Sequence, residues 1–447
     1  MNRILILGAG RSSGYLIEYL LEWSSSNGYE LDIADRFTDQ ILPLLKNHPS
    51  ARALNCDINN PEQRRSVIRG CTIVISMLPA FMHILVAEDC LAEGVSMATA
   101  SYESDDLRNL RPEIEAKGLQ FLNECGLDPG IDHMSAMQVI HRLENDGYTI
   151  TGFKSFCGGL IAKGSNDNPW GYKFSWNPRN VILAGSGTAR FLENGKLKFT
   201  PYSRLFSDPL SVSFINGDVY DGYPNRDSVG YQAIYGLENI DTMIRGTLRE
   251  SGYCRAWNIM VQLGLTDDSY AFPLKKGMTY REFTTAFLPT IAGDEKDAIR
   301  HAVNPKPDKR ALELFFWTGL LSDEEIPLKE GTPAIILQNL LETKWKLLPE
   351  DKDLVVMQHQ FDAVSVSTTK HITSSLQVEG INSSHTAMAK TVGIPLAIGV
   401  KMLLEKKYTR PGLILPVVPE FYEPVLKELG SRYAIRFEEH ETVELKT

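Results

Sequence analysis

The fold is decided by residues 3–14, RILILGAGRSSG, in which a short apolar run leads directly into a glycine-rich turn. An amphipathic segment follows, and a second apolar run, residues 30–34, ends at Asp35. This order of strand, glycine turn, helix and strand is typical of the first βαβ unit of a dinucleotide-binding domain. Gly8 permits the tight turn, and Gly10 lets the backbone approach a pyrophosphate that the amides opening the helix attract.

One position in this unit departs from the usual pattern, and two others bear on the choice of cofactor. Ser13 occupies the third glycine position of the G-x-G-x-x-G pattern, and the glycine follows one residue later as Gly14. A small side chain there still permits close packing of helix on strand. Asp35 can accept hydrogen bonds from the adenosine ribose, which favours NAD, whereas Arg36 can pair with the 2′-phosphate of NADP or be a solvated surface charge. We expect NAD, with NADP as the alternative; a glycine turn that binds no nucleotide is the other interpretation.

Length and composition narrow the class of protein. A chain of 447 residues with 43% hydrophobic content is too long for one core and predicts two or three domains. The net charge of -10 and the lack of a basic cluster argue against nucleic acid as a partner. Its cysteines and histidines show neither a C-x-x-C nor an H-E-x-x-H spacing, so no metal site or disulfide scaffold is expected. With no signal sequence or long apolar stretch, we expect a cytoplasmic enzyme without a membrane partner.

Short apolar runs continue to alternate with helical patterns beyond the first unit. The further predicted strands are Ala51–Cys56, Thr72–Met77, Val95–Ala100 and Leu119–Asn123. Strands alternating with helices indicate a doubly wound parallel sheet, so the predicted class is α/β with a Rossmann domain over residues 1–147.

The pattern changes near residue 148, which predicts an inserted α+β domain for substrate binding and dimerisation over residues 148–384. Its predicted elements are strands Thr149–Cys157, Leu354–His359 and Thr369–Val378, helices Leu237–Arg249 and Lys309–Trp317, and a helical insertion around 265–350. Residues 385–447 are expected to return to the Rossmann domain. They carry predicted helices Thr386–Glu405 and Pro419–Leu429 and a strand Tyr433–Phe437.

Two groups of polar residues lie where chemistry is expected. The run 126–133, GLDPGIDH, follows the last strand of the first domain, so Asp128 is fixed beside a rigid turn where it could act as an acid or base. The other interpretation is that Asp128 starts the turn and Asp132 caps the next helix. Further on, Arg226 and Arg245 lie beside turn-forming residues, which suits either carboxylate recognition or surface ion pairs.

Several motifs in the same order resemble the saccharopine dehydrogenases of the glutamate-forming type, also called saccharopine reductases. They are TASY at 99–102, GLDPGIDH at 126–133, CGG at 157–159, NPWGYKFSW at 168–176, YPNRDS at 223–228, RGTLR at 245–249, MAKTVG at 388–393 and PEFYEP at 419–424. The similarity covers nearly the whole chain.

The resemblance implies an oxidoreductase of lysine metabolism that transfers a hydride between a nicotinamide cofactor and saccharopine, giving 2-aminoadipate semialdehyde and glutamate. It further implies that three carboxylates of saccharopine are held by Arg226 and by a turn containing Arg245, Gly246 and Thr247. Ser101 and Tyr102 are then expected beside the reacting carbon. Because an amine must lose a proton and an imine must gain water, an acid-base group is needed, with Asp128 first and Tyr102 and His133 in reserve.

The predicted cofactor site combines the glycine turn with residues after the strands, among which Leu78, Ala100 and Leu127 are implied by the resemblance. Its members are Gly8, Gly10, Arg11, Ser12, Ser13, Asp35, Arg36, Asp57, Leu78, Ala100, Leu127 and Asp128. Ser13 and the run IAKG at 161–164 depart from the family pattern, so specificity could differ. A related reductase such as a carboxynorspermidine dehydrogenase, or a dinucleotide-sensing regulator without turnover, are the alternatives, and an apolar face on the helical insertion suggests a homodimer.

Overall fold

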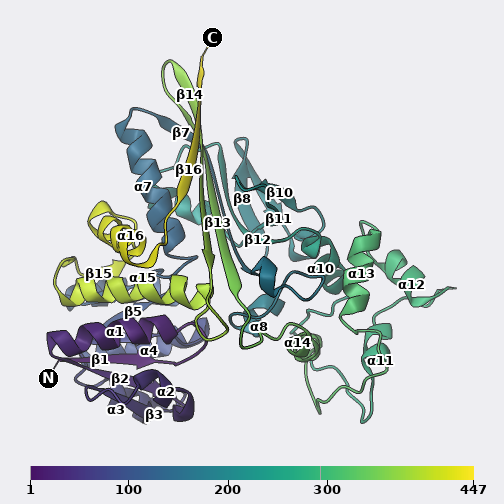
Figure 1. Ribbon diagram of the computed structural model, residues 1–447, viewed down its shortest axis with the longest axis horizontal. Helices are drawn as coiled ribbons and strands as arrows, with labels where there is room; N and C mark the ends of the chain where they lie inside the picture. The colour runs from purple at the N-terminus through teal and green to yellow at the C-terminus, as the bar shows by residue number, and fades with distance from the viewer. Residues whose placement is uncertain (1, 292, 447) are drawn as a thin grey trace. The chain divides into compact units, whose positions relative to one another are not determined.

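The computed structural model describes residues 2–291 and 293–446 and divides into two compact units. The first unit comprises Met1–Asn145 and Gly380–Phe437, and the second comprises Asp146–Glu379 and Glu438–Thr447. Each unit has its own sheet, and the chain passes from the first unit into the second, back into the first, and then into the second again (Figure 1).

The first unit contains a seven-stranded sheet in the order β15-β6-β5-β4-β1-β2-β3, with all neighbouring strands parallel. From β1 the chain builds outward to β2 and β3 on one side and to β4, β5 and β6 on the other. Parallel sheets of this kind bind ligands beyond the carboxyl ends of their strands, where the order reverses. The strands are β1 Asn2–Leu7, β2 Tyr29–Asp35, β3 Ala51–Asn55, β4 Ile73–Ser76, β5 Ser96–Thr99, β6 Gln120–Leu122 and β15 Gly412–Ile414.

Continuous apolar runs form the central strands because both faces of the sheet are covered. Ile4, Leu5, Ile6 and Leu7 of β1 are all 0% exposed, which is the pattern of a strand buried on two sides. The covering helices are α1 Gly14–Asn27, α2 Leu42–Leu45, α3 Pro61–Ile68, α4 His83–Glu93, α5 Asp105–Asn109, α6 Arg111–Ala116, α7 Ile131–Asn145, α15 Ala387–Leu404 and α16 Pro419–Tyr433. The predicted Rossmann sheet completed by C-terminal elements is therefore confirmed.

Helix α15 is the C-terminal contribution to the core of this unit. It lies beside α1 (Figure 1), and a Cβ at Gly393 would come within 2.8 Å of the Leu16 backbone nitrogen, so glycine permits the close approach. By length and composition α15 could cross a membrane, but 78% of it is buried inside the protein. An apolar helix covered in this way is a core element.

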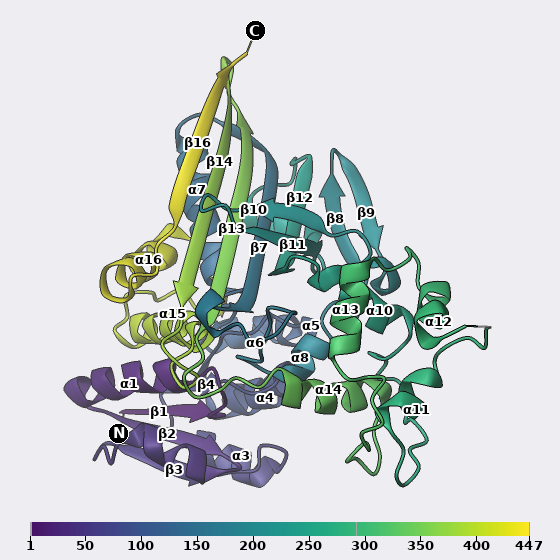
Figure 2. The ribbon, with the colours of Figure 1, turned by 45° about the vertical axis from the view of Figure 1, so that its right-hand side comes forward.

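The second unit is built on a nine-stranded mixed sheet with the main order β10-β11-β12-β7-β13-β14-β16. Strands β12 and β7 run parallel and the other pairs on this path are antiparallel. Figure 2 shows the long strands β7, β13, β14 and β16 together. The strands are β7 Thr149–Ile161, β8 Ala189–Glu193, β9 Lys196–Thr200, β10 Leu210–Ser213, β11 Val219–Pro224, β12 Thr242–Glu250, β13 Asp353–Val364, β14 Thr368–Glu379 and β16 Glu438–Leu445.

Helices and aromatic side chains complete this unit. Trp170, Trp257 and Trp345 are each 1% exposed or less and meet edge to face or tilted, with ring centroids 5.3–6.2 Å apart. Such ring pairs stabilise a core beyond the area that they bury. The helices are α8 Pro178–Ile182, α9 Gln232–Tyr235, α10 Tyr253–Gln262, α11 Tyr280–Thr285, α12 Glu295–Ala302, α13 Lys309–Trp317 and α14 Pro333–Lys344.

Three sequence-based expectations about elements are wrong. The predicted helix Leu237–Arg249 is largely the strand β12, in which hydrogen bonds to β7 and β11 override a weak helical pattern. The predicted strand Tyr433–Phe437 begins at the last residue of α16 and forms no strand. The last strand, β16, pairs with β14, so residues 385–447 do not all return to the first unit.

Candidate functional site

The glycine turn after β1 has the shape that a pyrophosphate requires. Gly8 has a φ of +94°, which strains any other residue, and a Cβ there would lie only 3.2 Å from the Met77 backbone. At Gly10 an added Cβ would meet no heavy atom within 4 Å, so the backbone faces open space at the start of α1. A helix N-terminus beside open backbone fits the phosphates of a dinucleotide.

Ser13 explains why the missing glycine is tolerated. Its side chain is fully buried, and its hydroxyl donates to the Gly10 carbonyl oxygen at 2.7 Å. The serine thus points into the protein and closes the turn. Arg11 and Ser12 lie in the same turn, where Arg11 is exposed and Ser12 half-buried.

The acid at the end of β2 is already engaged by the backbone. Asp35 accepts hydrogen bonds from the amides of Ala9 at 2.9 Å and Phe37 at 3.0 Å, one on each carboxylate oxygen. Arg36 follows as an exposed side chain and donates to Asp57 at 2.9 Å, which holds the pKa of that carboxyl below its usual range. Two residues predicted from the sequence to bind the cofactor, Arg36 and Asp57, therefore form a surface ion pair beyond the end of β2.

The remaining predicted cofactor residues come from the carboxyl ends of neighbouring strands. Leu78 follows β4, Ala100 follows β5, and Leu127 follows β6, and these three strands are adjacent in the sheet. Because parallel strands end at one edge, the fold gathers these residues on the same edge as Gly8.

The GLDPG segment is a closed loop that needs both of its glycines. Gly126 donates to the Pro129 carbonyl oxygen at 2.9 Å and accepts from the Ile131 amide at 2.8 Å. A Cβ on Gly130, whose φ is +144°, would lie only 2.1 Å from the Gly126 carbonyl oxygen. These contacts fix the backbone of Asp128, which is half-buried at the middle of the loop.

Asp128 meets Tyr102 within the first unit. The Tyr102 hydroxyl donates to Asp128 Oδ1 at 2.6 Å, and both side chains are half-buried. The two side chains come from the segments that follow β5 and β6. A phenol bound to a carboxylate can pass a proton between them, so two of the predicted acid-base residues form one pair.

His133 has a different setting from the one predicted for a catalytic base. It is 1% exposed, and its Nε2 lies 2.8 Å from Oε2 of Glu124, which is also buried. Glu124 additionally accepts the Glu103 amide at 2.9 Å. The imidazole is therefore enclosed in a network that ties α7 to the β5 and β6 loops. Asp132, expected as a cap, accepts the Gly130 amide at 2.6 Å.

Sequence reasoning missed a second histidine in this region. His83 begins α4 and is 2% exposed, with its ring nitrogens on the hydroxyls of Ser76 and Ser101. The only signal in the sequence was a polar ring in the otherwise apolar segment MLPAFMHILV, residues 77–86.

The predicted substrate residues of the second unit lie on adjoining strands. Arg226 is exposed just beyond β11 with a φ of +49°, and the amide of Asn225 donates to the Arg245 carbonyl oxygen at 2.8 Å. Arg245 is 7% exposed, and its guanidinium carbon is 4.1 Å from the centre of the Tyr231 ring. The expectation of a turn at Arg245 to Thr247 is wrong, because these residues lie inside β12.

The two other residues of this strand have separate surroundings. A Cβ on Gly246 would lie 2.6 Å from the Phe156 ring, so the glycine is required by packing. Thr247 follows it on the face that also carries Arg245 and Arg249, because side chains alternate along a strand. Arg249 is 3% exposed and lies within 6 Å of the rings of three tyrosines, Tyr172, Tyr223 and Tyr253.

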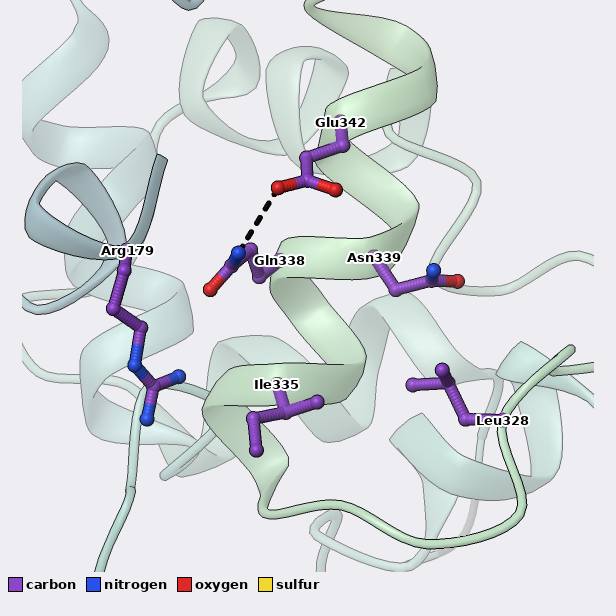
Figure 3. A pocket seen from close by; sticks show the side chains of 6 residues that line it. All are labelled: Arg179, Leu328, Ile335, Gln338, Asn339 and Glu342. Carbon is purple, nitrogen blue, oxygen red and sulfur yellow. Dashed lines mark hydrogen bonds between the residues drawn. The ribbon is translucent and has the colours of Figure 1, made fainter. Parts of the chain in front are cut away.

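A pocket of about 310 Å³ is present elsewhere in the second unit. Figure 3 shows its lining residues, where Gln338 donates to Glu342 on α14 at 2.9 Å and Arg179 comes from α8. None of the lining residues was predicted to bind substrate or cofactor; they are Arg179, Leu328, Ile335, Gln338, Asn339 and Glu342. Among residues 2–291 and 293–446, no cluster of three or more metal-ligating side chains is found.

Two family models match the chain. The model described as the saccharopine dehydrogenase NADP binding domain matches residues 4–122, and the model described as the saccharopine dehydrogenase C-terminal domain matches residues 126–435. Together they span both units.

Curated relatives match the chain over nearly its whole length. The chain is 34% identical to the mitochondrial alpha-aminoadipic semialdehyde synthase of Rattus norvegicus, over 99% of this chain and 48% of that protein. It is 32% identical to the saccharopine dehydrogenase (NADP+, L-glutamate-forming) of Saccharomyces cerevisiae, over 98% of this chain and 99% of that one. The chain thus spans about half the length of the mammalian relatives and nearly all of the yeast enzyme.

The agreement extends to three dimensions. The apo structure of histidine-tagged saccharopine dehydrogenase (L-Glu forming) from Saccharomyces cerevisiae superposes with a TM-score of 0.86 at 31% identity, covering 99% of this chain and 100% of that chain. The resemblance inferred from the motifs is confirmed, and the cofactor class is a nicotinamide dinucleotide. This chain belongs to the saccharopine dehydrogenase family.

Proposed function

We propose that this chain catalyses the NADP-dependent interconversion of saccharopine with 2-aminoadipate 6-semialdehyde and glutamate, as a step of lysine metabolism. The observation that carries the proposal is the pair of Tyr102 and Asp128, joined by a 2.6 Å hydrogen bond at the carboxyl edge of a dinucleotide-binding sheet. Membership of the family and the nearly full-length match to the yeast enzyme support the same reaction.

The pair supplies the proton transfers that amine oxidation needs. A bound nicotinamide would supply the acceptor for the hydride that leaves the carbon next to the secondary amine. Before that transfer, the substrate ammonium passes a proton to the Tyr102 oxygen while Tyr102 passes its own to Asp128. Asp128 then releases that proton to solvent, and the same two residues take a proton from water as it adds to the substrate imine. They return one to the nitrogen when the carbon–nitrogen bond breaks, so aldehyde and glutamate leave.

NADP is the cofactor that the adenosine edge favours, in place of the NAD that the sequence suggested. Both oxygens of Asp35 already accept backbone amides, which offsets its charge and leaves it less able to bind a ribose. Arg36 is exposed and forms a surface ion pair with Asp57, and such pairs contribute little to stability. A 2′-phosphate can therefore recruit the Arg36 guanidinium. The NADP named for the matching family model and the yeast relative supports this choice.

The carboxylates of saccharopine are assigned to the second unit and to Ser101. Arg226 offers an exposed guanidinium, and Arg245 offers a guanidinium that is stacked on the Tyr231 ring. Next to Arg245 in β12, Gly246 offers its backbone and Thr247 its hydroxyl. Guanidinium forks bind carboxylates in pairs of parallel hydrogen bonds, which suits a tricarboxylate substrate. His133 is assigned a structural role, because it is enclosed with Glu124.

The proposal is tested by mixing the purified chain with saccharopine and each oxidised cofactor while following the absorbance of the reduced nicotinamide. We expect turnover with NADP+ and a much lower kcat/KM with NAD+. Carboxynorspermidine is the competing substrate, and preferential turnover of it would contradict the assignment. Arg36→Ala, with the exposed Arg300→Ala as a matched control, should raise the KM for NADP+ and leave that for NAD+ unchanged.

Two further expectations from the sequence stay predictions. A homodimer is expected through the helical insertion, and analytical ultracentrifugation measures it directly. A cytoplasmic location is expected as well, although the name of the rat relative places that protein in mitochondria. Fractionation of the source cells with an antibody to this chain distinguishes the two compartments.

A further inference from the structure

A cluster of hydroxyls surrounds a buried imidazole at the carboxyl ends of β4 and β5. Ser76 ends β4 and is paired in register with Thr99, which ends β5. Ser101 follows two residues later, and His83 is the first residue of α4. The fold therefore brings four polar side chains to the edge of the sheet where ligands bind.

The histidine bridges the two strand ends. His83 Nδ1 lies 2.8 Å from Ser76 Oγ, and Nε2 lies 2.7 Å from Ser101 Oγ. Thr99 Oγ1, which is 3.5 Å from Nε2, accepts the Ser101 amide at 3.2 Å. Ser76, Thr99 and His83 are each 2% exposed or less, while Ser101 is half-buried. Ser101 is thus the member of the cluster that reaches outward.

Burial also sets the charge of the ring. Enclosure lowers the pKa of His83 to about 4, so the imidazole is neutral near pH 7 and has one donor and one acceptor nitrogen. Only one of the two serines can then donate to it, and the chain of hydrogen bonds has a direction. The positions of the hydrogens on the His83 ring and on the two serine hydroxyls follow from the requirement that buried donors have acceptors.

The buried serine decides that direction. If Ser101 donated to Nε2, Nδ1 would donate to Ser76, and the Ser76 proton would lack an acceptor. Among the residues that the structure describes, the Ser76 hydroxyl forms its side-chain hydrogen bond with His83. In the opposite direction Ser76 donates to Nδ1, Nε2 donates to Ser101, and the Ser101 proton points away from the ring. The buried Ser76 proton then has an acceptor, and the ring proton lies on the short 2.7 Å contact to Ser101 rather than on the 3.5 Å contact to Thr99.

We propose that His83 is a positioning residue that holds Ser101 as a hydrogen-bond donor to a carboxylate oxygen of the substrate. The inference rests on the proposed function, because saccharopine supplies the carboxylate. An ionised acceptor strengthens a hydrogen bond, and the polarised chain from Ser76 through the imidazole strengthens it further. Ser101 touches the substrate, and His83 acts through Ser101.

Two isosteric variants separate this role from simple packing. His83→Gln places an amide nitrogen near the position of Nε2 and keeps the donor to Ser101, whereas His83→Asn reaches only toward Ser76. Ser101→Ala removes the outward donor. We expect Ser101→Ala and His83→Asn each to raise the KM for saccharopine about 10- to 100-fold, as for loss of a hydrogen bond to a charged group. His83→Gln and the exposed control His301→Gln should stay within about threefold of the unaltered chain, and the KM for NADP+ should not change.

The double variant His83→Asn/Ser101→Ala completes the test. If His83 acts through Ser101, the second change adds less than about twofold to the first, whereas multiplying effects would overturn the inference. Equal losses in His83→Asn and His83→Gln would also overturn it. Inactivity of the unaltered chain toward saccharopine would instead refute the proposed function.

Folding of the variants does not limit the test. Selective ¹⁵N-histidine labelling of the unaltered chain reports the tautomer of His83, with its signals assigned by their loss in His83→Gln. We expect the proton on Nε2. A proton on Nδ1 would mean that Ser101 points inward and would contradict the inference.

Discussion

The burial of His83 predicts a specific loss of stability in acid. The folded protein holds the pKa of this imidazole at about 4, against an ordinary value of 6.5, because the ring is 2% exposed and desolvation disfavours its charged form. The unfolded chain therefore binds a proton that the folded chain does not between these two values. Stability from this group is fully present above about pH 6.5 and is lost as the pH falls toward about 4.

The magnitude follows from the size of the shift. The difference from 6.5 to about 4 corresponds to about 3 kcal/mol over the whole window, with a slope of at most about 1.4 kcal/mol per pH unit. In His83→Gln the titrating group is gone, so this part of the slope disappears whatever the absolute stability of the variant. The exposed His301→Gln should leave the slope unchanged.

Urea unfolding across this pH window measures the effect. Of the six tryptophans, all of which the structure describes, only Trp23 lies in the first unit. Subtracting the fluorescence emission of the Trp23→Phe variant from that of the chain with Trp23 therefore gives a signal that reports unfolding of the first unit. We expect the free energy of unfolding to fall less steeply with acid in His83→Gln than in the unaltered chain. Parallel curves would refute the burial and the neutral state of the imidazole on which the tautomer argument depends.

Three further predictions concern catalysis and the loops. Tyr102→Phe and Asp128→Asn should each lower kcat by about 10²- to 10⁴-fold, because the two residues form one proton-transfer pair. The double variant should be little worse than the poorer single variant in steady-state assays, and losses that multiply would show that the two residues act independently. Arg226→Ala should raise the KM for saccharopine strongly and leave cofactor affinity nearly unchanged, and an unaltered KM would remove this arginine from the substrate site. Gly10→Ala should leave the melting temperature unchanged and weaken the binding of NADP+ that calorimetry measures. Gly130→Ala should destabilise the chain by more than about 3 kcal/mol, because its Cβ would overlap the Gly126 backbone, and equal melting temperatures for the two variants would contradict the loop geometry.

The first unit was predictable because its signals are local. The run before Gly8 is apolar on both faces, the glycines come at the turn, and Asp35 comes at the end of the next strand, so periodicity and spacing indicate the sheet directly. The GLDPG loop was identified for the same reason, since Gly126 and Gly130 are required by the backbone itself.

The second unit was harder because its structure depends on distant pairing. The segment that forms β12 has a mixture of apolar and charged residues that resembles a helix face. It becomes a strand through pairing with β11 and with β7, in which Thr242 lies beside Gly152, ninety positions earlier in the chain. The placement of β16 against β14 has the same origin. A short stretch of sequence around β12 or β16 does not contain the strand with which it pairs.

The site itself was predicted in its chemistry more than in its contacts. Tyr102 and Asp128 were both named, yet their hydrogen bond joins loops that follow different strands and cannot be read from spacing. His83 was missed because a lone histidine in an apolar segment carries no motif, and its meaning comes from the two serines that surround it. The engagement of Asp35 by two amides likewise cannot be read from spacing, and it supports the proposal of NADP in place of the expected NAD.

The most direct test of the central claim is the stoichiometry of a single reaction mixture. The unaltered chain is incubated with saccharopine and NADP+, and glutamate, 2-aminoadipate semialdehyde and reduced cofactor are quantified by mass spectrometry and absorbance. We predict that the three products form in equal amounts and that Asp128→Asn abolishes all three together. Reduced cofactor without glutamate, or saccharopine left unchanged, would contradict the proposed function.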